Sequence, residues 1–532
     1  MIKKIISVLF LFGYFTLFAQ KIPFSYSLGF NNLAKTSDKS PNSNTIEYIE
    51  FDKDTIWLGT SNGLSKSTDS GNTWKNISFG EEGISALSIN NDTVWCATWH
   101  AMNDPFNEGT VLPVGSGLHY SADGGENWVD IPQPVDAADD SSVVYGINRI
   151  RALPITSDVN NFTRSIGFTK GYIWIASFAG ELRRSGNNGK TWKRVVLPPD
   201  YLDEIHPSDT LTFTLSPSGG ALGFESNLNH RVFSIVSSSE KTIYVGTANG
   251  INKSTDNGLS WKKFNHKNQT EAISGNFIVD LNFDQYRNVV WASTWKADDP
   301  DDFYAVSWSA DGGSSWHTLL PGLKVHDINF LISDSSGSFI SKEVLVASES
   351  GIYRSPDYGK TWISAPQMMD DNTRAVLTTN DFRSVNSRYL SNNNQSLWFG
   401  SLDGLANLTE TGEIWSGKWR VFVASSNTGS AANSESFAFP NPFSPDDEVV
   451  RFKYNTNNLP AKVSIRVFDF GMNLVRTVIQ NASRTISPDS APGDFWDGRD
   501  ENGNIVPNGV YFYRIDFDSN IEPVFGKIIV LM

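Results

Sequence analysis

The segment Ser67-Thr-Asp-Ser-Gly-Asn-Thr-Trp74 decides the fold, because its pattern returns at intervals along the chain. Ser and Asp oxygens can accept backbone N–H groups and close a hairpin, and Gly supplies the positive φ that the turn needs. The Trp then begins the next strand, where its ring fills the space between neighbouring sheets. Further copies occupy residues 121–128, 185–192, 254–261, 309–316 and 355–362, and a degenerate seventh copy occupies 408–415.

A second repeated element precedes these hairpins. Ile56-Trp-Leu-Gly-Thr60 has counterparts at 173–177, 243–247, 290–294, 344–348 and 397–401, each with a small fourth residue and a final Thr or Ser. A small residue fits where strands converge near a crowded axis. For the first repeat we predict strands A to D over 46–51, 55–60, 63–67 and 73–77. Seven such repeats predict an all-β, seven-bladed β-propeller; six or eight blades are the alternatives, because residues 21–44 could complete a blade.

The spacing Ser-x-Asp-x-Gly-x-Thr-Trp resembles the Asp box of the BNR-repeat families. Those families include sialidases, sortilin-type receptors, photosystem assembly factors and xyloglucanases. The resemblance covers about residues 45–425 and implies a β-propeller fold. We expect the box residues to be structural rather than catalytic. They are Asp69, Trp74, Asp123, Trp128, Trp192, Asp256, Trp261, Asp311, Trp316, Asp357 and Trp362.

Long insertions are predicted to gather on one face of the array. In a four-stranded meander, the A–B and C–D turns lie at one end, here called the box face. The B–C and D–A connections lie at the other end, here called the loop face. Insertions on one face of a repeat protein usually mark its binding surface. The large insertions fall in two B–C loops, at 99–115 and from 295 onward, and in three D–A connections, near 129–146, 195–230 and 364–384.

The two B–C loops carry similar residues, Thr98-Trp-His100 and Thr294-Trp-Lys296, and Asp-Pro follows each. Aromatic rings stack on apolar sugar faces and carboxylates accept from hydroxyls or amides, which indicates carbohydrate or peptide recognition. Packing of both Trp rings onto their own loops is the alternative. Arg149 and Arg151 suggest an anion contact, with ordinary surface arginines as the alternative. The predicted ligand-binding residues are Trp99, His100, Asp104, Arg149, Arg151, Phe178, Glu181, Trp295, Asp298 and Asp299.

The charge of the chain and the spacing of its possible metal ligands argue against nucleic acid and zinc as partners. The net charge is −15 and no Lys/Arg cluster appears, so a nucleic-acid partner is not expected. The seven His residues lack zinc spacing, and no metal site or cofactor is predicted. Ca²⁺ is the one alternative, because Asp298, Asp299, Asp301 and Asp302 offer oxygen ligands; a solvated loop is the simpler interpretation. The single cysteine, Cys96, is expected in the core.

Signals for catalysis are weak, and no catalytic residue is assigned. Sialidases carry an Arg-Ile-Pro motif before the first Asp box, and nothing before Ser67 matches it. A xyloglucanase-like glycosidase needs two carboxylates flanking a cleft, and the sequence does not pair them. We therefore predict a non-enzymatic module that binds glycan or peptide on the loop face. The alternatives are a glycoside hydrolase with paired carboxylates in the propeller cleft, and an envelope scaffold or assembly factor.

The first residues favour export. Met1-Ile-Lys-Lys4 is basic and Ile5 to Phe18 is largely apolar, which predicts a secretory signal peptide over residues 1–19. No later stretch approaches 18 apolar residues, so no transmembrane segment is expected. Residues 21–424 form the predicted propeller, and the Ser-rich segment 425–436 reads as a linker to a second domain over 437–532.

The second domain has its own motifs: Phe439-Pro-Asn-Pro-Phe443, Trp496-Asp-Gly-Arg-Asp500, Gly509-Val-Tyr-Phe-Tyr513 and Gly526-Lys-Ile-Ile-Val-Leu531. These resemble the Ig-like domain of the flagellar hook-capping protein and are similar to C-terminal sorting domains of proteins exported by type IX secretion. The resemblance implies a small Ig-like β-sandwich, a secretion machinery as partner, and a secreted or cell-surface location. The chain departs from the pattern by ending in Leu531-Met532 instead of a basic terminus.

Overall fold

A computed structural model gives a fold of β-strands with one short 3-10 helix in the part of the chain that it describes, which confirms the all-β prediction. The segment predicted as a signal peptide and residues 425–435 of the predicted linker lie outside the described residues. The described residues are 40–80, 82–107, 110–220, 222–297, 300–335, 338–372, 375–390, 394–424, 436–445, 448–456, 459–486, 493–518 and 523–531.

The described residues before 425 contain seven antiparallel meanders, called sheets 1 to 7. Sheet 1 contains β1 (Ile46–Asp52), β2 (Thr55–Thr60), β3 (Gly63–Ser67) and β4 (Lys75–Ile77). Sheet 2 contains β5 (Gly83–Asn90), β6 (Thr93–Asn103), β7 (Val111–Ser121) and β8 (Val129–Ile131). Sheet 3 contains β11 (Thr163–Thr169), β12 (Tyr172–Ser177), β13 (Glu181–Ser185) and β14 (Lys193–Arg194).

The other four sheets repeat this order. Sheet 4 contains β17 (Val232–Ser237), β18 (Ile243–Thr247), β19 (Gly250–Ser254), β20 (Trp261–Phe264) and an added edge strand, β15 (Glu204–Ile205). Sheet 5 contains β21 (Phe277–Asp284), β22 (Val289–Trp295), β23 (Ala305–Ser309) and β24 (His317–Leu319). Sheet 6 contains β25 (Val325–Ser335), β26 (Ser338–Ser348), β27 (Gly351–Ser355) and β28 (Ile363–Ser364). Sheet 7 contains β29 (Phe382–Tyr389), β30 (Gln395–Ser401), β31 (Leu405–Glu410) and β32 (Gly417–Phe422).

The strands predicted for the first repeat agree closely with sheet 1. β2 and β3 match at both ends, and β1 runs one residue further than predicted, to Asp52. β4 begins at Lys75 instead of Thr73, because the backbone N–H of Thr73 donates to Asp69 and holds that residue in the turn. The hydrogen bonds of the turn therefore set where the fourth strand starts.

The six good copies of the repeated hairpin share one set of hydrogen bonds. In the first copy, Ser67 Oγ donates to Asp69 Oδ1 at 2.8 Å and accepts from the N–H of Gly71 at 2.8 Å, while Thr73 N–H donates to Asp69 at 2.9 Å. The same three bonds recur in the other five copies, with Asn187 standing in for Asp in the third. Each turn is therefore satisfied by its own side chains.

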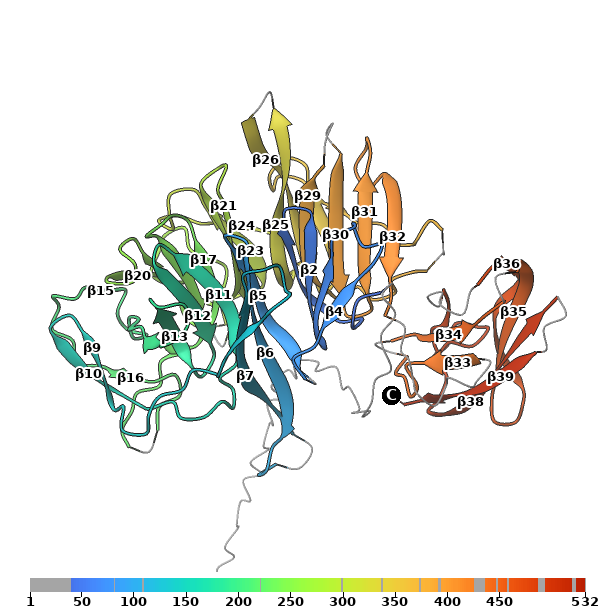
Figure 1. The fold of residues 1–532 in the computed structure, drawn as a ribbon, viewed down its shortest axis with the longest axis horizontal. Coiled ribbons are helices and arrows are strands. Elements are labelled where there is room, and N and C mark those ends of the chain that lie inside the picture. Colours follow the sequence, from blue (N-terminus) through green and yellow to red (C-terminus); the bar gives the residue numbers. More distant parts are fainter. Residues whose placement is uncertain are drawn as a thin grey trace, which may run out of the picture.

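The sheets pack face to face in chain order, and the last packs against the first (Figure 1). Strand β1 contacts β5 of sheet 2 and β29 of sheet 7. The ring of Trp74 meets that of Trp398 edge-on at 6.4 Å, and Arg420 donates to the backbone oxygens of Ser70 and Gly71. The first and last sheets are therefore joined by packing and by hydrogen bonds, in a propeller-like arrangement.

Insertions decorate this frame on more than one side. The β6–β7 hairpin projects from the loop face, and the long β25–β26 hairpin projects from the box face (Figure 1). Two D–A connections pair into a small sheet of β9 (Ser142–Tyr145), β10 (Asn148–Ala152) and β16 (Thr214–Leu215), and the helix η1 (Leu228–His230) follows. This small sheet follows the outer edge of sheet 4, because Tyr145 Oη donates to Ile205 and Leu259. The expectation of a single decorated face therefore needs correction.

Two further sheets form after residue 435. One contains β33 (Ser436–Phe439), β34 (Val450–Tyr454) and β37 (Asp494–Trp496). The other contains β35 (Ala461–Phe468), β36 (Leu474–Arg484), β38 (Gly509–Phe517) and β39 (Val524–Val530), and the two share one apolar core. The first strand begins at Ser436, one residue before the predicted boundary. Buried Arg451 joins this module to the rest of the chain by donating to Val376 O at 2.7 Å and to Asp403 at 2.6 Å.

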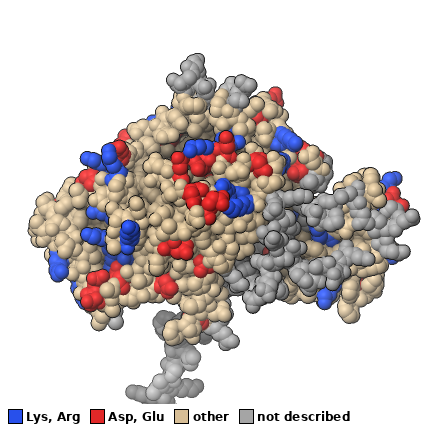
Figure 2. Space-filling model, viewed as in Figure 1, with Lys and Arg blue, Asp and Glu red and all other residues tan. Residues whose placement is uncertain are grey.

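The charges are dispersed on the face seen in Figure 2, where acidic and basic side chains are interspersed among uncharged residues. Cys96 is fully buried, and burial raises the pKa of its thiol well above the usual value, as expected of a core residue. Within the described ranges, no helix has the length and apolar character needed to cross a bilayer.

Candidate functional site

A channel runs along the axis that the seven innermost strands surround. It comprises a cavity of about 970 Å³ toward the box face and one of about 370 Å³ toward the loop face, and each is lined by all seven of these strands. The two cavities share Ile49, Glu50, Asn282 and Asp327, which therefore lie at the waist between them. Concave, mixed polar and apolar surfaces of this size are where ligands bind in most proteins.

Each of the seven innermost strands has a bulge at the same place, near the loop face. The pairing register skips one residue per strand, and these residues, called the bulge ring, are Glu47, Ser85, Arg164, Phe233, Val279, His326 and Arg383. A bulge redirects a side chain out of the alternation of its strand. All of them except Ser85 line the loop-face cavity. The repeated backbone irregularity thus presents a set of chemically different side chains at one mouth.

A row of aromatic rings runs from sheet 2 to sheet 5, and two of them, Phe233 and Trp295, line the loop-face cavity. Trp99 lies 6.0 Å from Phe162, Phe178 lies 5.9 Å from Phe233, and Phe233 lies 4.4 Å from Phe277, all measured between ring centroids. Phe277 is also the cross-strand partner of Trp295, which lines the cavity. We call these six residues the aromatic arc: Trp99, Phe162, Phe178, Phe233, Phe277 and Trp295.

Arg164 bridges the two halves of the aromatic arc. Its guanidinium carbon lies 5.2 Å from the ring centroid of Phe162 and 5.4 Å from that of Phe233, which are cation–π distances. Within the described residues, Arg164 forms no side-chain hydrogen bond or ion pair. Burial lowers the pKa of Arg164, opposed by the charges of Tyr48 and Glu47. An arginine remains protonated in spite of such a shift, so a positive charge without an ion-pair partner faces the channel.

On the opposite side of the mouth, the charged side chains pair with one another. Arg383 donates to Asp381 at 2.8 Å, and His326 Nε2 lies 3.4 Å from the same carboxylate. Burial lowers the pKa of His326 and favours its neutral form. Burial alone would raise the pKa of Asp381, but its contacts with His326 and Arg383 keep that pKa below the usual value. Arg383 and Asp381 therefore cancel, whereas Arg164 has no ion-pair partner in the described part of the chain.

The two carboxylates at the waist, and Asp280 and Glu47 in the loop-face cavity, have shifted pKa values. Burial raises the pKa of Glu50 to about 8 and that of Asp327 to about 7. Burial and the charge of Asp327 raise the pKa of Asp280 well above its usual range. Burial also raises the pKa of Glu47, against the charge of Arg383. Because desolvation favours the neutral acid, much of the negative charge at the waist is absent near neutral pH.

Comparison with known proteins finds only partial likeness. No protein-family model matches the chain. A probable oligoxyloglucan-reducing end-specific xyloglucanase from Neosartorya fischeri is 30% identical over 125 residues, which are 23% of this chain and 14% of that protein. A xyloglucanase from Acetivibrio thermocellus is 25% identical over 224 residues, which are 42% of this chain and 20% of that protein. The chain thus spans a fifth or less of the length of these curated relatives.

Among solved structures, a GH74 enzyme from Niastella koreensis superposes with a TM-score of 0.48 and 12% sequence identity. The superposition covers 92% of this chain and 73% of that enzyme.

Of the residues predicted from sequence, Trp295 lines the loop-face cavity, Phe178 contacts Phe233 of that lining, and Trp99 contacts Phe162 of the aromatic arc. Trp295 also donates from Nε1 to Val325 O at 2.7 Å, and Lys324 lies 4.6 Å above its ring. His100 is exposed beside Trp99, where its Nδ1 lies 2.9 Å from Ser116 Oγ. Both tryptophan rings therefore pack against neighbouring residues, and Trp295 in addition lines the cavity.

Other predicted residues lie elsewhere. Asp104 accepts hydrogen bonds from Phe106 and Asn107 and so holds the tip of its own hairpin. Arg149 and Arg151 belong to β10 in the outer-edge sheet, and Arg151 stacks 4.2 Å from the Phe224 ring centroid. Asp298 and Asp299 lie outside the described residues. Among the residues that are described, no group of three His, Cys, Asp or Glu side chains is arranged to hold a metal ion.

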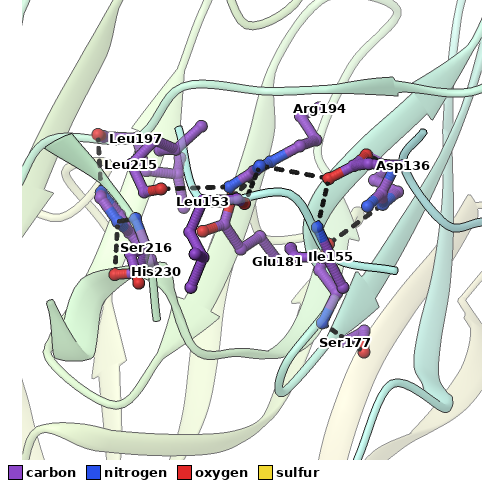
Figure 3. Close-up of polar contacts among 12 residues, drawn as sticks. Asp136, Leu153, Ile155, Ser177, Glu181, Arg194, Leu197, Leu215, Ser216 and His230 are labelled. Atoms are coloured by element: carbon purple, nitrogen blue, oxygen red, sulfur yellow. Dashed lines mark hydrogen bonds and ion pairs between the residues drawn. The ribbon is translucent and has the colours of Figure 1, made fainter. Parts of the chain in front are cut away.

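Glu181 is buried instead of forming the predicted binding surface, and Figure 3 shows its contact with Arg194. Its carboxylate accepts from Arg194 at 2.5 Å, and Arg194 also contacts Asp136, which pairs with Arg183 at 2.7 Å. Arg194 further donates to Leu153 O at 2.7 Å. This network ties the D–A connection before sheet 3 to that sheet, so Glu181 stabilises the insertion and is left out of the site.

The predicted ligand-binding residues did not include Phe162, Arg164, Phe233 or Phe277. All four lie at the beginning of strand A or just before it, where no repeated motif marks the chain. A signal did exist in the strand pattern. In Thr163-Arg-Ser-Ile166 the charged residue interrupts the buried positions, and a bulge at the equivalent place in every repeat would have aligned Arg164 with Glu47 and Arg383.

Proposed function

We propose that this protein is an exported propeller that binds glycan at the loop-face mouth of its channel. One observation carries the proposal: six residues of the bulge ring and Trp295 line a concave mouth of about 370 Å³, and other rings of the aromatic arc contact Phe233 in that lining. Aromatic faces stack on the apolar faces of sugars, and a few polar groups among them fix orientation. The partial similarity to two xyloglucanases supports a glycan ligand over a peptide.

We also propose that the chain belongs to the Asp-box, or BNR-repeat, proteins and that its propeller has seven blades. The six hairpins with a common hydrogen-bond set support Asp-box, or BNR, repeats. Seven meanders around one channel support seven blades rather than six or eight.

We further propose that residues 437–532 form an Ig-like domain that sorts the chain through a type IX-like pathway after a signal peptide over 1–19. Two sheets sharing one core are consistent with a β-sandwich. The chain would then be secreted or held at the cell surface. Deleting residues 437–532 should trap the protein in the periplasm of the producing cell, as measured by fractionation. Unchanged export would reject the sorting role and leave the binding proposal standing.

The binding proposal is tested by screening the purified chain on an array of plant and microbial polysaccharides. We expect a subset of glycans to bind, and Trp99→Ala and Phe178→Ala to weaken that binding at least tenfold, because each removes a stacking face. Phe470→Ala is the matched control, since Phe470 is 78% exposed on the C-terminal module. Absence of binding to every glycan would contradict the proposal and would favour an envelope scaffold.

A glycoside hydrolase is the second candidate, and two carboxylates of the channel favour it. A hydrolase needs one neutral and one charged carboxyl group near each other, and the shifted pKa values of Asp280 and Asp327 would allow that pairing. Release of reducing sugar from any glycan that binds, abolished by Asp280→Asn or Asp327→Asn, would establish the enzyme. Binding without release would establish the non-enzymatic module.

A further inference from the structure

Arg164 is unusual among the charged residues of the channel because it forms no ion pair or side-chain hydrogen bond in the described part of the chain, and Glu47, whose charge acts on it, has its pKa raised by burial. Its side chain lines the loop-face cavity, and its guanidinium carbon lies 5.2 Å from the Phe162 ring centroid and 5.4 Å from that of Phe233. Its counterpart in sheet 7, Arg383, has the same place in the bulge ring but is paired with Asp381. Burying a cation costs solvation energy, and the two cation–π contacts offset only part of that cost.

Arg164 is also held in a defined direction. Its guanidinium lies within cation–π distance of two phenyl rings, and Phe233 packs in turn against Phe178 and Phe277. A planar guanidinium with free N–H groups matches a carboxylate through two parallel hydrogen bonds. The flanking rings of Phe162 and Trp99 offer stacking surface within reach of that contact.

We infer that Arg164 is the anchor for the carboxylate of a uronic-acid residue, so that the glycan bound at this mouth is acidic. This inference rests on the proposed function and narrows its ligand class. The sugar ring stacks on the aromatic arc while its carboxylate accepts from the guanidinium. The neutralised pair of Arg383 and Asp381 across the mouth adds no competing charge. An acidic peptide could satisfy the arginine but would not require the row of rings from Trp99 to Phe277.

The test compares uronate oligosaccharides with their carboxyl-reduced forms, which keep the ring and lose the charge. Oligomers of galacturonate, of mannuronate and of alternating glucuronate are titrated against the full chain by calorimetry. For at least one series, we expect the acid form to bind at least tenfold more tightly than its reduced form. Equal affinity of both forms in every series, or binding of neutral glycans only, would overturn the inference while leaving the proposed function intact.

Arg164→Gln should remove the preference for the acid form and leave the affinity for the reduced form within about twofold. Arg151→Gln is the matched control, since Arg151 also stacks on a phenyl ring but lies on the outer-edge sheet. Full retention of the acid preference in Arg164→Gln would overturn the assignment. If that variant fails to fold, the comparison of acid and reduced forms on the unaltered chain still decides. Tighter binding of an acidic peptide than of any uronate would also overturn it.

Discussion

The two ends of the seven sheets differ in how they use repetition. At the box face, the same Ser, Asp and Gly recur, and each hairpin satisfies its own polar groups. At the loop-face end of strand A, the bulge recurs but the residue changes from Glu47 to Arg164 to His326. Constant residues at a constant place indicate a structural role. A constant bulge with changing residues indicates a backbone scaffold that places different functional side chains at the channel mouth.

The pKa shifts follow the same division. Burial alone would raise the pKa of Asp69, but hydrogen bonds from Thr73 and Ser67 hold it below the usual value. At the channel waist, burial raises the pKa of Glu50 and Asp327 without enough partners to oppose it. Self-satisfied carboxylates therefore stabilise the fold, whereas the waist carboxylates are held against their solvation preference.

The largest effect is expected from filling the space at a box glycine. Gly71 has a φ of +80°, and a Cβ there would lie 2.9 Å from both Trp398 and Phe422 of sheet 7. Gly71→Val should cost about 4 kcal/mol, from left-handed strain plus overpacking between the first and last sheets. Gly80→Val is the matched control, because its φ is +99° with nothing within 4 Å. Denaturant unfolding measures both, and equal losses would contradict the packing of sheet 1 on sheet 7.

The next effect concerns pH and separates the two kinds of carboxylate. Groups with raised pKa values stabilise the fold fully below their unfolded pKa, and that contribution is lost as pH rises through the folded pKa. For Glu50 and Asp327, the loss runs from about pH 4 to the folded values of about 8 and 7. We expect the free energy of unfolding to fall by about 3 kcal/mol over that window, allowing for screening by channel water.

The double variant Glu50→Gln, Asp327→Asn should flatten this slope between pH 5 and pH 8. Asp69→Asn is the control, since its lowered pKa places its stabilisation above pH 4 and its loss at lower pH. Chemical unfolding at several pH values measures all three proteins. A slope unchanged in the double variant would mean that the waist does not hold neutral acids.

A smaller effect is expected from removing one box carboxylate. Asp69→Ala loses the bonds from Ser67 and Thr73 and should cost about 1–2 kcal/mol. Val279→Ser, in the bulge ring, changes a side chain that lines the cavity and should cost less than about 1 kcal/mol. Thermal unfolding of both variants tests the division between the two ends. A larger loss for Val279→Ser would contradict it.

The sequence predicted the repeated frame well because its determinants are local. A turn closed by Ser67, Asp69 and Gly71 requires only eight neighbouring residues, so the strands on either side follow from the motif. The channel mouth depends instead on contacts between sheets. Arg164 of sheet 3 contacts Phe233 of sheet 4, and no local sequence pattern predicts a contact between two sheets.

Insertion lengths were a weaker guide. They led to Trp99, Phe178 and Trp295 at the mouth, but also to Arg149 and Glu181, whose connections run along the outer edge or into the core. The β25–β26 hairpin lengthens an A–B turn on the box face, where the sequence predicted no insertion. Loop length shows where the chain tolerates extra residues, and the fold decides which side they reach.

Hydroxyl-radical footprinting with a bound glycan tests the central claim most directly. If the loop-face mouth is the binding site, oxidation of Trp99, Phe162 and Trp295 should fall when glycan is present. Phe51, Tyr286 and Phe330 line the box-face cavity of the same channel and should react unchanged. Protection of this second set, with Trp99 and Trp295 still fully reactive, would contradict the account.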